Sequence, residues 1–276
     1  MSEQLAVALT IAGSDSGGGA GIQADLKTFH AYGVFGATAV TAVTVQDTTG
    51  VHGYVAVPTE TVRAQIDAVA VDLRPAACKT GMLASAELVR EVAAAITRHR
   101  LPHYVLDPVM VATSGHRLLD AGAEQAVLEA LLPLATIVTP NLDEAALLVG
   151  REVRTPAQME EAAQRLVAAG ARAALLKGGH LPGDAVVDVF FDGHSTRAYR
   201  RPRIDTRSTH GTGCTLSAAV AAGLALGAPL QAAVESALDY VHRAIAQAPG
   251  LGRGHGPLNH LVTPRLPQAD PAPTTG

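Results

Sequence analysis

The sequence contains no tryptophan, and aromatic residues make up only 3% of its 276 residues. So few aromatic side chains argue against the stacking platforms with which proteins bind single-stranded nucleic acids. The formal net charge of -4 also argues against a general polyanion-binding surface, although it leaves room for a local phosphate site. We therefore expect small molecules, and no nucleic acid, among the partners of this protein.

Cysteine is equally scarce, with only Cys78 and Cys214 in the chain. Two cysteines cannot build a disulfide framework or a four-cysteine zinc site. The first residues include Glu3 where a signal peptide would carry basic residues. We therefore expect a reduced, cytoplasmic protein.

Long apolar spans are also missing. The longest stretch without charge lies between His210 and Glu235, is rich in alanine and glycine and contains Pro229. This composition predicts a buried helix and a turn rather than a membrane span. We therefore expect no membrane among the partners.

The residues that are abundant point to a folded α/β protein. Hydrophobic residues make up 48% and charged residues 17%, which excludes wholesale disorder. Short β-branched runs alternate with amphipathic helical patterns, which predicts a parallel sheet with helices on both faces. A β-hairpin over 186–199 and two alanine-rich helices over 212–226 and 229–246 follow. We expect one domain over residues 1–261 and a disordered, proline-rich tail over 262–276.

Polar motifs follow several of the predicted strands directly. In a parallel α/β sheet, ligands bind beyond the carboxyl ends of the strands, where these motifs would meet. We therefore expect the chemistry of the protein immediately after the residues that end five strands: Ala12, Val45, Leu106, Val138 and Leu176.

Two glycine-rich segments are candidates for binding phosphate. The loop from Gly13 to Gly21 lacks the lysine of a P-loop, and by itself it suits a ligand loop and an ordinary turn equally. The segment His210-Gly-Thr-Gly-Cys-Thr215 opens an uncharged helix. Backbone N–H groups of Gly211, Thr212 and Gly213 could converge there into an anion hole. The helix dipole predicts a lowered pKa for Cys214, which would favour a reactive thiolate over an inert buried thiol.

Four further residues stand at strand ends. Asn141 and Glu144 lie one helical turn apart and offer oxygen ligands suited to Mg2+, although Asn141 alone suits an ordinary helix N-cap. Lys177 could reach a polyphosphate. The amide of Gln46 can donate and accept hydrogen bonds at the same time. For each of these two residues, the alternative is a place in an ordinary solvated turn. Together with the anion hole, these residues indicate phosphoryl transfer from a nucleotide.

The motifs follow one another in an order that is specific in combination: Ala12–Asp15, Gly18–Lys27, Val43–Gln46, Lys79–Met82, Asp107–Met110, Pro140–Asn141, Lys177–His180, His210–Thr215 and Gly254–His260. This order resembles the hydroxymethylpyrimidine/phosphomethylpyrimidine kinases of thiamine biosynthesis, a family of the ribokinase-like superfamily. The resemblance runs from about Leu5 to Leu261. It departs at Ser16-Gly17, where relatives often read Pro-Ser, which puts the rigidity of this loop in doubt.

The resemblance implies a fold and a reaction. The fold is a ribokinase-like three-layer α/β/α sandwich with a mainly parallel central sheet, assembled as a homodimer. The reaction uses ATP and Mg2+ to phosphorylate 4-amino-5-hydroxymethyl-2-methylpyrimidine to its monophosphate. A second ATP then converts the monophosphate to the diphosphate.

The resemblance also implies roles for individual residues. Cys214 matches the catalytic base, beside an anion hole formed by Gly211, Thr212 and Gly213. Gln46 matches the residue that binds the aminopyrimidine. The remaining matches surround these two groups: Asp25, Gly13 and Met82 around the substrate, Lys177, Asp107 and Asn141 near the ATP phosphates, and Asn141 with Glu144 around Mg2+, largely through water and phosphate.

Two other functions compete with this interpretation. Pyridoxal kinase shares the fold and the nucleotide chemistry, so a pyridoxal/pyridoxine kinase or a kinase for both vitamins is the nearest alternative. A protein that senses a pyrimidine or nucleotide without turnover is the other, and Cys214 with the Asn141/Glu144 pair argues against it. A metal hydrolase is discarded because the histidines lack ligand spacing such as H-x-x-x-H.

Overall fold

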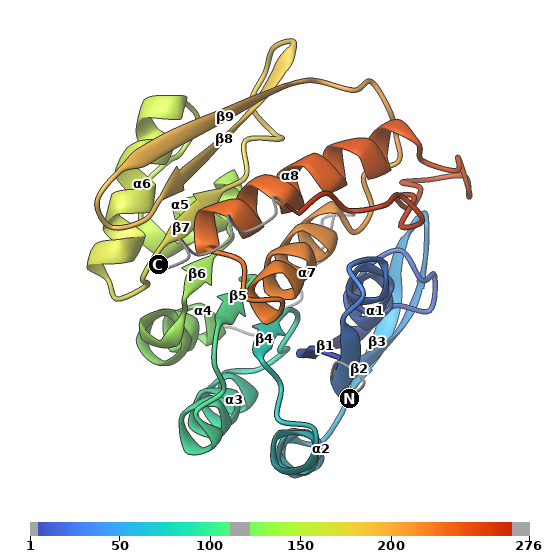
Figure 1. Cartoon of the computed structure of the whole chain (residues 1–276), viewed down its shortest axis with the longest axis vertical. Coiled ribbons are helices and arrows are strands. Elements are labelled where there is room, and N and C mark those ends of the chain that lie inside the picture. The colour runs from blue at the N-terminus through green and yellow to red at the C-terminus, as the bar shows by residue number, and fades with distance from the viewer. Residues whose placement is uncertain (1–4, 111–121, 267–276) are drawn as a thin grey trace, which may run out of the picture.

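The computed structural model describes residues 5–110 and 122–266, and within them nine strands form a single sheet. The strand order is β3-β2-β1-β4-β5-β6-β7-β8-β9 (Figure 1). Neighbouring strands from β2 to β7 pair in parallel, and β3, β8 and β9 add antiparallel strands at the two edges. The bounds are β1 Val7–Ser14, β2 Phe35–Asp47, β3 Gly50–Ala56, β4 Ala77–Thr80, β5 Tyr104–Leu106, β6 Ile137–Val138, β7 Ala174–Leu176, β8 Ala185–Phe191 and β9 Thr196–Pro202.

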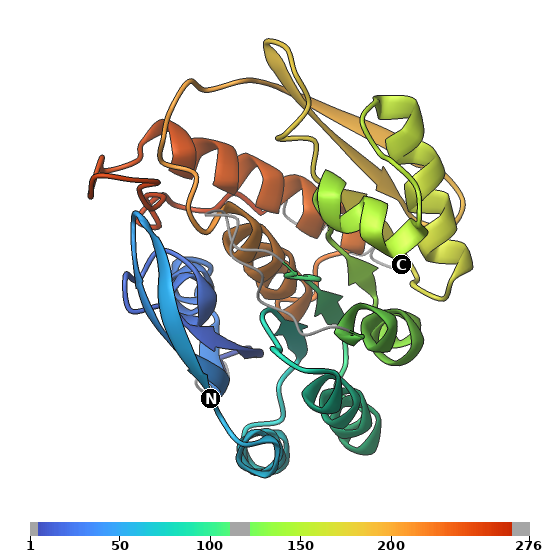
Figure 2. The same ribbon diagram turned by 180° about the vertical axis from the view of Figure 1, so that it is seen from behind.

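Helices cover both faces of this sheet. One buried apolar cluster packs β-strand side chains against α2 to α6, and a second packs them against α1, α7 and α8 (Figures 1 and 2). The predicted three-layer α/β/α sandwich is therefore confirmed. The bounds are α1 Gly21–Ala31, α2 Thr59–Asp72, α3 Ala86–His99, α4 Ala123–Ala126, α5 Leu142–Val149, α6 Pro156–Ala168, α7 Thr212–Ala225 and α8 Leu230–Ala246.

The central strands show why the sequence folds this way. Residues Ala8 to Ala12 of β1 are buried without interruption, because both faces of the strand are covered by helices. Such strands read as continuous apolar runs rather than as alternating patterns. Thr10 on β1 and Lys79 and Thr80 on β4 are polar exceptions, and all three are fully buried. Within the described residues, no helix is long and apolar enough to cross a membrane.

The carboxyl-terminal segment packs further than the sequence indicates. Val262 is buried, and Leu266 packs against the apolar cluster beneath α7 and α8. A guanidinium N–H of Arg243 on α8 donates a hydrogen bond to the carbonyl of Thr263. Packing therefore continues past Leu261, after which the tail was predicted to begin. The reason is that the apolar side chains of Val262 and Leu266 contact the cluster that includes α7 and α8. The rest of the predicted tail, 267–276, lies outside the described residues.

A buried histidine joins this segment to α7. The Thr215 hydroxyl lies 2.9 Å from Nε2 of His260, and the Tyr240 hydroxyl donates to the His260 carbonyl. Burial lowers the pKa of His260 from 6.5 to about 4, so the folded protein holds the imidazole neutral. Because the unfolded chain binds the proton more readily, the stability from this group is complete above pH 6.5 and is lost as the pH falls toward 4.

We therefore expect the free energy of unfolding to fall by about 2–3 kcal/mol between these pH values through His260 alone. A His260→Gln variant lacks the titrating group, so its stability should change less over the same range. Urea denaturation of both proteins at a series of pH values measures the difference. Parallel curves would show that His260 does not contribute to the pH dependence.

Candidate active site

A pocket of about 770 Å³ lies at the carboxyl ends of the parallel strands. This volume falls in the range of small-molecule sites. Its lining includes residues at or just beyond the carboxyl ends of five strands: Gly13, Gln46, Asp107, Asn141 and Lys177. The prediction that the motifs meet at one edge of the sheet is therefore confirmed.

The amino-terminal end of α7 forms one wall of the pocket. Gly211, Thr212, Gly213 and Cys214 all line it. Gly211 adopts a φ of +80°, and a side chain there would collide with the carbonyl oxygen of Gly19. Glycine is therefore required at this position, both for the left-handed backbone and for the close approach of the two glycine-rich loops. This approach brings the free N–H groups of a 14-residue helix to the pocket, as an anion hole requires.

Asp15 and His210 fasten the two loops to each other. Nε2 of His210 lies 2.8 Å from the Asp15 carboxylate, which also accepts hydrogen bonds from three backbone N–H groups, those of Gly17, Gly19 and Ala20. Burial alone would raise the pKa of Asp15, but these hydrogen bonds outweigh it and hold the pKa below its usual value. Neither residue received a role from the sequence. An aspartate inside a glycine-rich loop, where many N–H groups lack partners, is the signal that could have indicated one.

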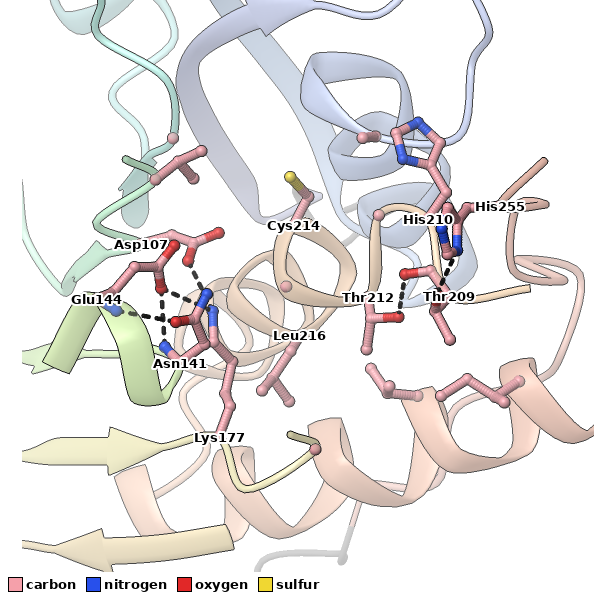
Figure 3. A pocket seen from close by; sticks show the side chains of 18 of the residues that line it. Asp107, Asn141, Glu144, Lys177, Thr209, His210, Thr212, Cys214, Leu216 and His255 are labelled. Carbon is pink, nitrogen blue, oxygen red and sulfur yellow. Dashed lines mark hydrogen bonds and ion pairs between the residues drawn. The ribbon is translucent and has the colours of Figure 1, made fainter. Parts of the chain in front are cut away.

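A charged cluster stands on the opposite side of Cys214 from His210 (Figure 3). Nζ of Lys177 lies 3.1 Å from Oδ1 of Asp107 and 3.7 Å from Oε2 of Glu144. The hydroxyl of Ser217, on α7, donates to Oδ2 of Asp107. Burial alone would lower the pKa of Lys177, but the two carboxylates raise it. Lys177 is therefore a held cation in the pocket and not the solvated turn residue of the alternative interpretation.

Asn141 and Glu144 form a helix cap. Oδ1 of Asn141 accepts hydrogen bonds from the backbone N–H groups of Asp143 and Glu144, and Oε2 of Glu144 accepts the N–H of Asn141. This reciprocal capping box starts α5. Burial and the nearby Asp107 carboxylate raise the pKa of Glu144, against the effect of Lys177. Within the described residues, no group of three or more His, Cys, Asp or Glu side chains could hold a metal ion.

The prediction of a lowered pKa for Cys214 is wrong. Burial, together with the carboxylates of Asp25 and Asp107, raises the pKa of this thiol to about 12. The ammonium group of Lys79 and a backbone hydrogen bond to Gly21 act in the other direction without compensating. The sequence places Cys214 correctly at the start of the helix, but it does not show that the residue is half-buried in a pocket wall with the carboxylates of Asp25 and Asp107 nearby.

The residues assigned to the substrate occupy two different positions. Gln46 lines the pocket, where its amide nitrogen lies 3.3 Å from Nε2 of His210 and its amide oxygen accepts from the Thr44 hydroxyl. Gly13 and Met82 line the same pocket, and a Cβ on Gly13 would come within 3.3 Å of the Met82 sulfur. The structure therefore gathers three of the four predicted residues around one space.

The fourth residue, Asp25, lies behind this wall. Its carboxylate is fully buried, with its two oxygens 2.9 and 3.0 Å from Nζ of Lys79, and it accepts a hydrogen bond from Thr10. Asp25 is not among the residues that line the pocket. Lys79 was not singled out as a site residue from the sequence. A lysine in an otherwise apolar strand is a usable signal, because a buried charge needs a partner.

Comparison with known proteins places this pocket in a family of enzymes. The family model described as phosphomethylpyrimidine kinase matches residues 15–259. The hydroxymethylpyrimidine/phosphomethylpyrimidine kinase of Rhizobium meliloti is 53% identical over 259 residues, which cover 93% of this chain and 97% of that protein.

Solved structures agree. The phosphomethylpyrimidine kinase of Clostridium difficile is 38% identical with a TM-score of 0.78, covering 87% of this chain and 99% of that chain. The pyridoxal kinase of Bacillus subtilis, solved as an ADP complex, is 41% identical with a TM-score of 0.87, covering 93% of this chain and 98% of that chain. The chain described here belongs to the phosphomethylpyrimidine kinase family.

Proposed function

We propose that this enzyme transfers the γ-phosphoryl group of ATP to 4-amino-5-hydroxymethyl-2-methylpyrimidine and then, from a second ATP, to the resulting monophosphate. The observation that carries the proposal is the convergence of Gln46, Cys214 and the Asp107–Lys177 pair on one pocket at the end of α7. The relative from Rhizobium meliloti carries both activities in its name, which supports a two-step reaction.

In the first step, the pyrimidine ring lies between Gln46, Gly13 and Met82. The Cys214 thiol loses its proton to water in the pocket, and the thiolate accepts the proton of the substrate hydroxyl as the oxygen attacks. The new bond joins this oxygen to the γ-phosphorus, and the bond from the γ-phosphorus to the bridging oxygen of ADP breaks. N–H groups of Gly211 and Gly213 stabilise the negative charge on the transferring group.

The charged cluster holds the nucleotide on the other side of Cys214. The Lys177 ammonium is well placed to contact the ATP phosphates, because it is fixed by Asp107 at the pocket wall. A Cβ on Gly213 would come within 3.1 Å of Nζ of Lys177, so the cation adjoins the anion hole. The two positive elements therefore flank the place where the phosphoryl group moves.

The residues present fit Mg2+ held through water and phosphate. Asn141 and the Glu144 carboxylate already accept backbone N–H groups, which leaves few lone pairs for direct ligation. Mg2+ binds few protein groups and retains several waters, so such a donor set suits it. When bound, Mg2+ neutralises charge on the phosphate oxygens. Glu144, with Asn141 as its neighbour, is the side chain that we expect to orient the waters.

Glu144→Gln should raise the Mg2+ concentration required for half-maximal activity, with activity returning in part at high Mg2+. The variant keeps an oxygen that can accept the Asn141 N–H, so the helix cap survives while the charge is lost. Carboxylate contacts through water contribute part of the ion's binding, so the loss is partial. Activity titrated against Mg2+ at saturating ATP measures the effect. A superimposable titration curve would refute the role of Glu144.

Pyridoxal is the second candidate substrate, because a pyridoxal kinase is 41% identical with a TM-score of 0.87. We expect kcat/KM for the pyrimidine alcohol to exceed that for pyridoxal, since Gln46 presents a donor and an acceptor to the aminopyrimidine edge. Steady-state kinetics on both substrates with the purified protein decides between them. The homodimer implied by the resemblance and the cytoplasmic location expected from the cysteine content also stay predictions, and sedimentation equilibrium tests the first.

A further inference from the structure

Lys79 is a buried cation that the proposed mechanism does not use. It lies on β4, near the centre of the sheet, with a fully buried side chain. Its ammonium donates hydrogen bonds to both oxygens of Asp25, 2.9 and 3.0 Å away, and Thr10 donates to the same carboxylate. Asp25 and Thr10 therefore hold the ammonium group in one place.

The ammonium group lies directly behind the pocket wall. A Cβ on Gly81, which lines the pocket, would come 3.7 Å from Nζ of Lys79. Helix α7, which begins with the pocket residues Thr212 to Cys214, packs against β4. The cation is thus fixed close to the place where Cys214 enters the pocket, although it does not itself line that pocket.

The charges around Cys214 come from four segments of the chain: β4, α1 and the residues directly after β5 and β7. Lys79 on β4 and Asp25 on α1 face it from behind the wall, and Asp107 and Lys177 face it from the charged cluster. Of these charges, Lys79 has the largest effect on the pKa of Cys214 and lowers it, and the opposing effect of Asp25 is smaller. The ammonium group of Lys79, held behind the wall where Cys214 enters the pocket, therefore favours the thiolate over the thiol.

A buried ion pair is weak evidence for stability. Removing two charges from water costs several kcal/mol, and apolar residues of similar size often serve the fold as well. The position of this pair behind a pocket thiol indicates a different reason for keeping it.

We propose that Lys79 is a positioning residue that stabilises the thiolate form of Cys214, with Asp25 and Thr10 holding its ammonium group behind the pocket wall. This inference rests on the role as base proposed above for Cys214. Without the Lys79 ammonium, burial and the carboxylates of Asp25 and Asp107 would disfavour the thiolate form still more.

Alkylation of Cys214 by iodoacetamide, without ATP or pyrimidine, tests this proposal. The thiolate attacks the reagent carbon, forms a thioether and releases iodide, so the rate below the pKa reports the thiolate fraction. In Lys79→Met, each unit by which the pKa of Cys214 rises should slow alkylation by roughly threefold, because the higher nucleophilicity of a more basic thiolate offsets part of the loss. Peptide mass spectrometry separates Cys214 from Cys78, and rates are measured at several pH values.

The sign of the change separates this role from a purely structural one. A variant that merely loosens the fold exposes the thiol and speeds alkylation. The double variant Lys79→Met/Asp25→Asn leaves no unpaired buried charge, so it decides the question if Lys79→Met does not fold. It should also react more slowly than the wild type, because the effect of Lys79 exceeds that of Asp25. Arg98→Met removes an exposed cation and should leave the rate unchanged.

Alkylation of Cys214 that is equally fast or faster in folded Lys79 variants would overturn the proposal. This readout uses no substrate, so it does not depend on whether Cys214 is the base. Retained phosphorylation in Cys214→Ala, together with slowed alkylation in Lys79→Met, would remove the proposed base but not the effect of Lys79. Lost phosphorylation in Cys214→Ala, together with unchanged alkylation in the Lys79 variants, would support Cys214 as the base and refute the effect of Lys79.

Discussion

Cys214→Ala should lower the rate of the first phosphorylation by ~10²–10⁴-fold, the usual contribution of a general base. The second phosphorylation should fall less, because its nucleophile is a phosphate that is already largely ionised. Nucleotide binding should change little, since Lys177 and the N–H groups of the anion hole remain in place. Separate assays of the two steps, with ATP binding measured by calorimetry, test these three expectations together.

Cys78→Ala is the matched control. Cys78 is the other cysteine of the chain, is fully buried in the apolar cluster beneath α2 to α6, and does not line the pocket. This variant should keep both phosphorylation rates, with at most a loss of stability. If Cys214→Ala retains wild-type activity in the first step, the sulfur is not the base.

Gln46→Leu should reduce kcat/KM for the pyrimidine alcohol by roughly 5- to 150-fold, the equivalent of about 1–3 kcal/mol for one unsatisfied buried polar group. The amide can accept a hydrogen bond from the 4-amino group and donate to the adjacent ring nitrogen. Leucine has a similar size but leaves this edge unpaired. In the structure, the amide is already oriented by Thr44 and His210, so the wild type loses little freedom on binding.

Pyridoxal provides the internal control for Gln46→Leu. It lacks the adjacent donor and acceptor, so any activity toward it should fall much less in the variant. General damage to the pocket, such as the lost contact between Gln46 and His210, lowers kcat/KM for both substrates alike. Comparing the loss on the pyrimidine alcohol with the loss on pyridoxal therefore removes its effect. An equal loss on both substrates would show that Gln46 does not recognise the aminopyrimidine edge.

The architecture of the site was predictable because its signals are local. Strand runs such as Ala8 to Ala12 and the polar residues after them can be recognised in short windows, and the parallel sheet brings their carboxyl ends together. The start of α7 at Thr212 can also be recognised locally. It follows Gly211, whose left-handed backbone favours glycine.

The parts that could not be predicted depend on long-range contacts. The pKa of Cys214 follows from its burial, which is set by elements distant in the sequence. The Lys79–Asp25 pair joins β4 to α1, and the Asp15–His210 contact joins two loops 195 positions apart. Local patterns identify each partner as polar, but the pairing appears only when the sheet is assembled.

The most direct test of the whole account is a single incubation of the purified protein with Mg2+, ATP and 4-amino-5-hydroxymethyl-2-methylpyrimidine, followed over time by mass spectrometry. We expect the monophosphate to appear first and the diphosphate to follow, with one ADP formed for each phosphoryl group transferred. Absence of both products, with pyridoxal phosphorylated under the same conditions, would contradict the proposed substrate.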